Sequence, residues 1–396
     1  MKLLQNEYDE LTIKTEEDMS EKLKFISDNL KWTVNDVKDS RIIVAEPEKN
    51  EMPGQMKLLE DGTCGDFYNE LEKVAPVSDR EAAEIVYRGS NRFAVLRDEN
   101  GQMQVIPTFY TAQNGLLKRR GCFCPAITGN YAIVRPAPST EEAFLNDSAR
   151  RCKSSEKWGI IDGGCIANAS EGYVVLDAFD GYNAFKSEIS STWEDVEFSN
   201  GRVSYEGYMA DFEIKDEIAI DGLKNTLEEL GVTVENIKAY ARYTTSDVTQ
   251  SAMAATIYYV LNDTPIRLAS KLGVEHKGDS SIAVFSEKIK DLGMLLKESE
   301  EQVEKLGNTE IEFPANCLEN ALKKVHLLNK HGVEAVDEVI IDPSSIQSAL
   351  DIVLRVNEVL KTTAQVENYS TTKLLNYTEE VTKLLNSKFS ELDKAS

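Results

Sequence analysis

Residues 243–277 read YTTSDVTQSAMAATIYYVLNDTPIRLASKLGVEHK, and the fold that we predict is built outward from this stretch. A polar cluster lies between two apolar runs whose β-branched and aromatic residues are typical of strands. A basic residue lies inside the second run, and one of only three histidines follows it. Because buried charges are costly unless they are paired or used, we predict a recognition surface beside paired strands. Its candidate residues are Thr244, Thr245, Ser246, Asp247, Ser251, Arg267 and His276.

The flanking sequence predicts three regions. Residues 1–78 indicate helix joined by polar linkers, residues 79–278 contain short β-branched and aromatic runs, and residues 279–396 carry apolar residues at helical spacing. The order of these patterns predicts an α+β protein. We expect an antiparallel β-rich central domain with an N-terminal helical extension and a C-terminal helical region.

Turn and cap residues refine this prediction. Asn100-Gly101 and Asn200-Gly201 each lie between apolar runs, and Asn-Gly is the strongest short signal for a β-hairpin. Ser280 or Ser281 is suited to cap a helix, and the apolar stripe from Phe285 to Leu306 predicts one long helix behind it.

The composition is that of an acidic globular protein. The 396 residues are 41% hydrophobic with a net charge of −24, which suits about two or three domains. No run approaches the roughly 18–20 apolar residues of a membrane span, and the N-terminus lacks the apolar core of a signal peptide. We therefore expect a cytoplasmic protein with no membrane contact. Net negative charge also disfavours polyanions such as nucleic acid.

Residues 80–153 depart from this acidity, with 11 basic and 7 acidic side chains. Cations interleaved with aromatic residues are typical of proteins that bind single-stranded nucleic acid, although strands favour aromatic residues in any case. The candidate contacts are Arg88, Arg92, Arg97, Lys118, Arg119 and Arg120. Any contact with a polyanion is expected here.

Enzyme and metal motifs give weak signals. The sequence has no G-x-S-x-G, P-loop, H-E-x-x-H or G-x-G-x-x-G pattern. Ser246, Asp247 and His276 have the side chains of a hydrolytic triad. The alternative interpretation is structural: Asp247 and the neighbouring hydroxyls cap a strand end, and Arg267 pairs with a carboxylate on a neighbouring strand.

Four cysteines lie in the β-rich region, and four thiolates can bind zinc. Their spacing departs from the paired C-x2–4-C pattern, so we interpret them as buried thiols and assign no metal and no cofactor. They are Cys122, Cys124, Cys152 and Cys165.

The order of several short motifs resembles the uncharacterised phage and plasmid proteins grouped as domain of unknown function 932. The resemblance covers about residues 85–310 and rests on NRFAVLRDENGQMQVI at 91–106, TTSDVTQSAM at 244–253, TPIRLA at 264–269 and His276. Ala269 and Ser270 stand where the family has a cysteine and an asparagine, and the hydroxyl and acid segment lacks the family's histidine. The resemblance implies a protein of a phage or another mobile element that acts in a bacterial cytoplasm.

We therefore expect a non-enzymatic binding protein in DNA metabolism or in the takeover of host functions. Its expected partners are single-stranded nucleic acid, a phage or host protein, or further copies of the chain. Two alternatives remain open: a structural or assembly protein of the virion, and a hydrolase that uses Ser246, Asp247 and His276.

Overall fold

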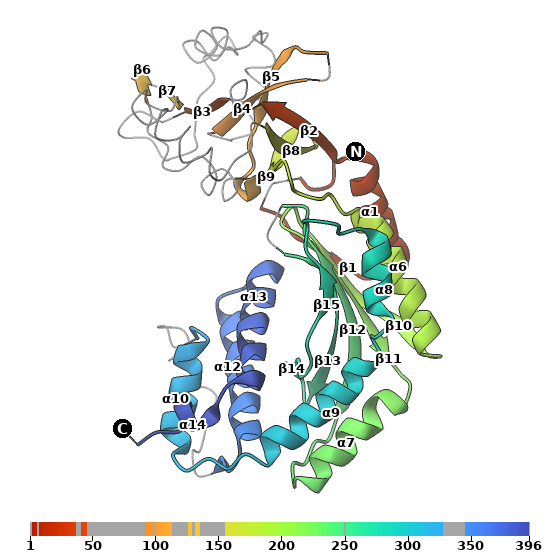
Figure 1. Cartoon of the computed structure of the whole chain (residues 1–396), viewed down its shortest axis with the longest axis vertical. Helices are drawn as coiled ribbons and strands as arrows, with labels where there is room; N and C mark the ends of the chain where they lie inside the picture. The colour runs from red at the N-terminus through yellow and green to blue at the C-terminus, as the bar shows by residue number, and fades with distance from the viewer. Residues whose placement is uncertain are drawn as a thin grey trace.

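The structure is a computed structural model of the chain. It describes residues 2–5, 8–36, 41–45, 92–98, 100–112, 126–128, 131–134, 155–248, 251–327 and 345–395. Within these residues the protein is α+β, as the sequence predicts. A curved antiparallel sheet occupies the middle, and helices lie on both of its faces (Figure 1).

The central sheet contains seven strands in the order β1-β10-β11-β12-β13-β14, and β15 also pairs with β13. The stretch at 243–277 supplies the end of β12 and all of the last three strands, and Arg267 lies just after β14 instead of inside a strand. The strands are β1 (Leu11–Ile13), β10 (Val196–Val203), β11 (Tyr208–Ile214), β12 (Ile237–Thr245), β13 (Met253–Leu261), β14 (Thr264–Ile266) and β15 (Leu272–Val274).

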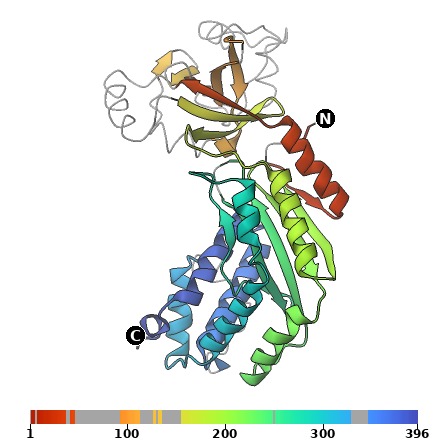
Figure 2. The same cartoon turned by 45° about the vertical axis from the view of Figure 1, so that its right-hand side comes forward.

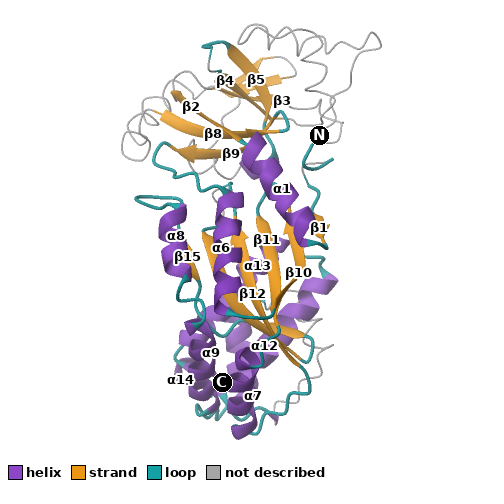
Figure 3. Cartoon of the chain, turned by 90° about the vertical axis from the view of Figure 1, so that its right-hand side faces the viewer, coloured by secondary structure: helices purple, strands orange, loops and turns teal. Residues whose placement is uncertain are grey.

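One face of this sheet is the main core of the protein. Alternate residues of a strand point to opposite faces, and on β12 and β13 one set is apolar or aromatic, as with Tyr243 and Ile257. Five helices cover this face (Figures 1 and 3). They are α1 (Glu16–Asn29), α6 (Ala178–Thr192), α7 (Ile218–Glu229), α8 (Ile282–Ile289) and α9 (Met294–Gly307).

The opposite face of the sheet carries the other set of side chains, which are mainly polar or tyrosine, with Met209, Ala254 and Val260 among them. Arg242 on β12 lies beside Asp211 on β11 and Thr256 on β13. The C-terminal helices α12 (Ala349–Val366) and α13 (Thr371–Thr382) lie on this side (Figure 1). We call this surface the polar face of the sheet.

The remaining C-terminal elements are α10 (Pro314–Lys324), the short 3-10 helix η2 (Lys383–Asn386) and α14 (Phe389–Leu392). In the described residues after 279 the chain is mainly helical, which agrees with the predicted C-terminal region. Ser281 caps α8 by accepting a hydrogen bond from the Val284 amide, as expected. The predicted long helix is divided, because a turn at residues 290–293 ends α8 and α9 begins after Gly293.

A second β region lies beyond one end of the central sheet (Figure 2). A three-stranded sheet contains β2 (Lys31–Asp36), β8 (Ser155–Ile161) and β9 (Gly164–Ser170). A five-stranded sheet contains β3 (Arg41–Ala45), β4 (Arg92–Arg97), β5 (Met103–Pro107), β6 (Ala126–Thr128) and β7 (Tyr131–Val134). The Asn100-Gly101 hairpin is confirmed, since β4 and β5 pair around it and Gly101 has a φ of +79°.

Two predictions differ from the structure. Asn200-Gly201 is not a hairpin turn: β10 runs through it with a bulge, and the chain reverses at residues 204–207. Gly201 instead faces Ile13 of β1, so pairing with a distant strand overrides the local turn signal. The N-terminal segment contains the expected helix α1 but also β1, β2 and β3, each of which finds its partner strand far along the chain.

Candidate functional site

The polar face of the sheet and the helices α12 and α13 enclose a cavity of about 860 Å³, which we call the cleft. The sheet is its floor, and the two helices form its roof. Tyr173 and His276 lie at one end and Arg267 at the other. On β13, Met253 pairs with Val274 of β15 near the His276 end, and Tyr259 pairs with Ile266 of β14 near the Arg267 end. These two β13 positions are six residues apart, so at about 3.3 Å per residue the two ends of the cleft are roughly 20 Å apart. The cleft is therefore elongated.

A buried ion pair forms the centre of the floor. The guanidinium group of Arg242 donates from Nε and Nη2 to the two carboxylate oxygens of Asp211, at 2.6 and 2.8 Å. Tyr258 and Asn200 also donate to Asp211, at 3.1 and 3.3 Å. Asn200 and Arg242 lie on the two strands next to β11, and Tyr258 lies on β13, one strand further, so the sheet itself aligns this network.

Arg242 stays charged in this setting. Burial lowers its pKa, but the charge of Asp211 and the contact with Tyr258 more than offset burial and raise the pKa above its usual value. Asp211 accepts hydrogen bonds from Nε and Nη2, and the group also contacts Tyr258. The floor of the cleft thus carries a fixed cation whose charge is paired with Asp211.

At one end of the cleft, His276 is held against Tyr173 with ring centroids 4.9 Å apart and an angle of 1° between the planes. Nδ1 of His276 lies 3.0 Å from the carbonyl oxygen of Val174. Burial lowers the pKa of His276, although the Val174 bond opposes this, so the ring is neutral at pH 7. Because a carbonyl only accepts, Nδ1 carries the proton and Nε2 is an acceptor. Nε2 is buried and has no partner within the described residues.

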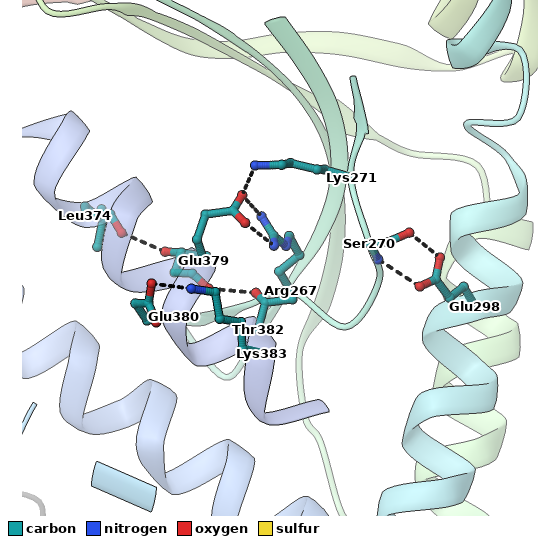
Figure 4. A network of polar contacts seen from close by, with 10 residues as sticks. Arg267, Ser270, Lys271, Glu298, Leu374, Glu379, Glu380, Thr382 and Lys383 are labelled. Carbon is teal, nitrogen blue, oxygen red and sulfur yellow. Dashed lines mark hydrogen bonds and ion pairs between the residues drawn. The ribbon is translucent and has the colours of Figure 1, made fainter. Parts of the chain in front are cut away.

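The roof helix α13 is held at each end by a carboxylate. Near its start, Glu10 accepts hydrogen bonds from the amide and hydroxyl of Thr371 and also pairs with Arg202 of the floor. Near its end, Glu379 pairs with Arg267 and Lys271 (Figure 4). Only Val381 of α13 is fully buried. Polar contacts therefore contribute much of what attaches this helix to the sheet.

The cleft is basic in a strongly acidic protein. Two acidic residues, Glu275 and Glu379, lie in its lining. Six basic residues line it: Arg202, Arg242, Arg267, Lys271, Lys277 and Lys361. The ammonium group of Lys361 on α12 has no ion pair within the described ranges. Arg202 and Arg242 are paired with Glu10 and Asp211, so the lining and its counter-ions keep two more positive than negative side chains. This local excess of positive charge, in a chain of net charge −24, favours a negatively charged ligand.

Two of the tyrosines that line the cleft already contact other groups through their rings. Tyr258 stacks on Tyr240 at a centroid distance of 5.0 Å, and the guanidinium of Arg242 lies 4.3 Å from the same ring centroid. Tyr173 stacks on His276 and contacts Trp32 at a tilt of 32°. These contacts reduce the ring surface that a ligand could stack on.

Four of the predicted site residues line the cleft: Thr244, Ser251, Arg267 and His276. Thr245, Ser246 and Asp247 are buried beside it. Asp247 accepts a hydrogen bond from Tyr208, and burial, against the effect of that bond, raises its pKa to about 7. The stretch supplies part of the floor of the cleft, but its predicted residues divide between the cleft and the adjacent core.

The triad geometry is not assembled. The hydroxyl of Ser246 donates to the carbonyl of Glu206 at 2.5 Å, and Nδ1 of His276 is occupied by Val174. Within the described residues no hydrogen bond joins Ser246, Asp247 and His276. The partner of Arg267 also differs from the structural interpretation, because Glu379 comes from α13 and not from a neighbouring strand.

The predicted nucleic-acid contacts are only partly described. Arg97 is exposed and donates to the carbonyl of Gly101 in the β4–β5 hairpin. Arg92 lies in β4. Arg88, Lys118, Arg119 and Arg120 lie outside the described residues, as do Cys122, Cys124 and Cys152. Cys165 is buried, and burial raises the pKa of its thiol to about 12.

Sequence reasoning missed Asp211, Arg242, Tyr258 and Glu379. The sequence does contain a signal for the first three. Each is a polar or tyrosine residue inside an apolar strand, and another polar or tyrosine residue lies two positions away, on the same face of the strand. No local pattern indicates that Glu379 faces Arg267, since 112 residues separate them.

No family model, curated protein or solved structure matches the chain. Among the helices that the structure describes, none has the length and apolar character needed to cross a membrane.

Proposed function

We propose that this chain is a binding protein and that its cleft holds an elongated ligand with negatively charged groups. One observation carries the proposal: six basic residues surround a cavity in a protein whose net charge is −24. Low-dielectric walls that carry one sign of charge concentrate ligands of the opposite sign. The volume of about 860 Å³ lies in the range of roughly 300–1,000 Å³ that is typical of small-molecule sites.

The Lys361 and His276 parts of the cleft call for different groups on the ligand. The ammonium of Lys361 donates, and Nε2 of His276 accepts. A ligand that satisfies both carries an oxyanion and, at the His276 end, an O–H or N–H group. Binding without turnover fits the bonding of Ser246 and His276 to separate backbone carbonyls.

The test is equilibrium dialysis of the protein against a bacterial small-molecule extract, followed by mass spectrometry. Wild-type protein is expected to enrich anionic compounds, and Lys361→Glu is expected to lose that enrichment because it reverses a charge in the cleft. Lys297→Glu is the matched control, since Lys297 is 78% exposed on α9, which packs on the other face of the sheet. Enrichment of neutral compounds only, or equal losses in both variants, would contradict the proposal.

A second candidate function rests on residues 80–153 and their excess of basic side chains. We propose that they contact single-stranded nucleic acid, as suits a cytoplasmic protein of a phage or mobile element that acts in DNA metabolism. Replacing Lys118, Arg119 and Arg120 by Ala should weaken oligonucleotide binding at about 50 mM salt and flatten its salt dependence. No gel shift of wild-type protein under these conditions would exclude this function.

A further inference from the structure

The end of the cleft at Arg267 has the geometry of an oxyanion site. Arg267 donates from Nη1 and Nη2 to the two carboxylate oxygens of Glu379 at 2.8 and 3.2 Å, and Lys271 donates to the same carboxylate at 3.1 Å (Figure 4). This two-pronged arrangement is the one by which arginine recognises carboxylates and phosphates. All three side chains line the cleft.

The site is not saturated by Glu379. The side chain of Arg267 is only 8% exposed, and its Nε has no hydrogen-bond partner in the described residues. Two cations face a single carboxylate, so the group retains one net positive charge. A buried donor without a partner destabilises the protein, and an oxyanion with a third oxygen or a different tilt would satisfy it.

The backbone that carries the two cations is fixed independently of α13. Residues 267–271 connect β14 to β15, and both strands pair with β13. The carboxylate of Glu298 on α9 accepts hydrogen bonds from the amide and hydroxyl of Ser270, both at 2.9 Å (Figure 4). The connection therefore stays in place on the sheet whether or not Glu379 is bound to it.

Glu379, in contrast, lies on α13, a helix that is packed less firmly than the strands next to Arg267 and Lys271. This helix fully buries only Val381, packs Leu374 and Tyr377 partly against the core, and is held by Glu10 at its other end. A structural clamp between α13 and the sheet is the simpler explanation for the pair. However, a buried ion pair contributes little net stability over apolar packing, and this one borders a large cavity.

We propose that Arg267 and Lys271 form an oxyanion subsite of the cleft, that Glu379 occupies it in the unliganded protein, and that an acidic group of the ligand replaces Glu379. This inference rests on the proposed function of the cleft as a site for an anionic ligand. The acidic group is a phosphate or a carboxylate. Its arrival releases the end of α13 from the sheet and so couples binding to movement of the roof.

The direction in which one substitution changes the binding affinity separates this proposal from a structural clamp. Glu379→Gln removes the competing charge, so inorganic phosphate or glutarate should bind at least about tenfold more tightly than to wild-type protein in calorimetric titrations. The probe whose affinity increases more in Glu379→Gln shows whether the subsite prefers phosphate or carboxylate. Glu380→Gln, one residue along the same helix and paired with Lys383, should leave both affinities unchanged. Arg267→Gln should abolish the gain in the Glu379→Gln background.

Hydrogen exchange gives a second readout. A saturating concentration of phosphate or glutarate should speed hydrogen exchange of the α13 amides in wild-type protein and leave the exchange of the α6 amides unchanged. Equal or weaker binding by Glu379→Gln would refute the displacement mechanism. If Lys361→Glu still reduces binding in that case, the cleft remains the ligand site and only the role of Glu379 is wrong. If neither probe binds any variant and Lys361→Glu has no effect on dialysis, both proposals fail.

Discussion

Replacing Asp211 by Asn is the most informative test of how the floor of the cleft is built. The side chains of Asp211 and Arg242 are 2% and 16% exposed. Asn keeps the shape of the side chain and part of its hydrogen bonding, but it removes the negative charge that compensates Arg242. The substitution therefore leaves a cation in the floor without its counter-ion.

The expected cost follows from this burial. Removing one partner of a buried ion pair destabilises a protein by about 3–5 kcal/mol. Because Arg242 borders the cleft and water can reach it, we expect the lower end, about 3 kcal/mol. With a dependence of roughly 3 kcal/mol per molar urea, the unfolding midpoint should fall by about 1 M.

The assay is urea unfolding at pH 7 followed by tyrosine and tryptophan fluorescence. Glu197→Gln is the control, because Glu197 forms an exposed ion pair with Lys215 near the end of the same sheet and should leave the midpoint unchanged. The double substitution Asp211→Leu with Arg242→Leu should recover most of the lost stability, since it removes both charges together. A loss below about 1 kcal/mol in Asp211→Asn would refute the view that the pair is desolvated.

Three further outcomes are expected. Burial raises the pKa of Asp247 to about 7, so the folded protein retains a proton that the unfolded chain releases; the free energy of unfolding should fall as pH rises from about 4 to 7, and Asp247→Asn should flatten this decline in urea titrations. Gly181→Ala should destabilise by about 1–3 kcal/mol in thermal unfolding, because a Cβ there would lie 2.5 Å from Met253, whereas the open Gly172 position should tolerate Ala. Arg267→Lys should weaken binding of phosphate or glutarate to the Glu379→Gln protein, because lysine cannot form the two-pronged contact.

The predicted and observed folds agree where local chemistry decides the outcome. The Asn100-Gly101 hairpin and the Ser281 cap depend on a few adjacent residues, and both are present. The Asn200-Gly201 prediction is wrong because β1 pairs with β10 across that position and keeps the strand extended. The local turn preference of Asn-Gly does not prevail over pairing with strands on both sides.

The sequence alone determined the α+β class, the helical character of the described C-terminal residues and the strand-forming character of residues 243–277. These properties follow from hydrophobic periodicity, which depends only on residues that are close together in the sequence. Only the tertiary structure decided that Thr244, Arg267 and His276 share a cleft with α13, and that Asp247 lies beside it in the core. Glu379 reaches Arg267 across 112 residues because α12 and α13 pack over the polar face of the sheet. Contacts of that range depend on how completed elements dock, and no local pattern encodes them.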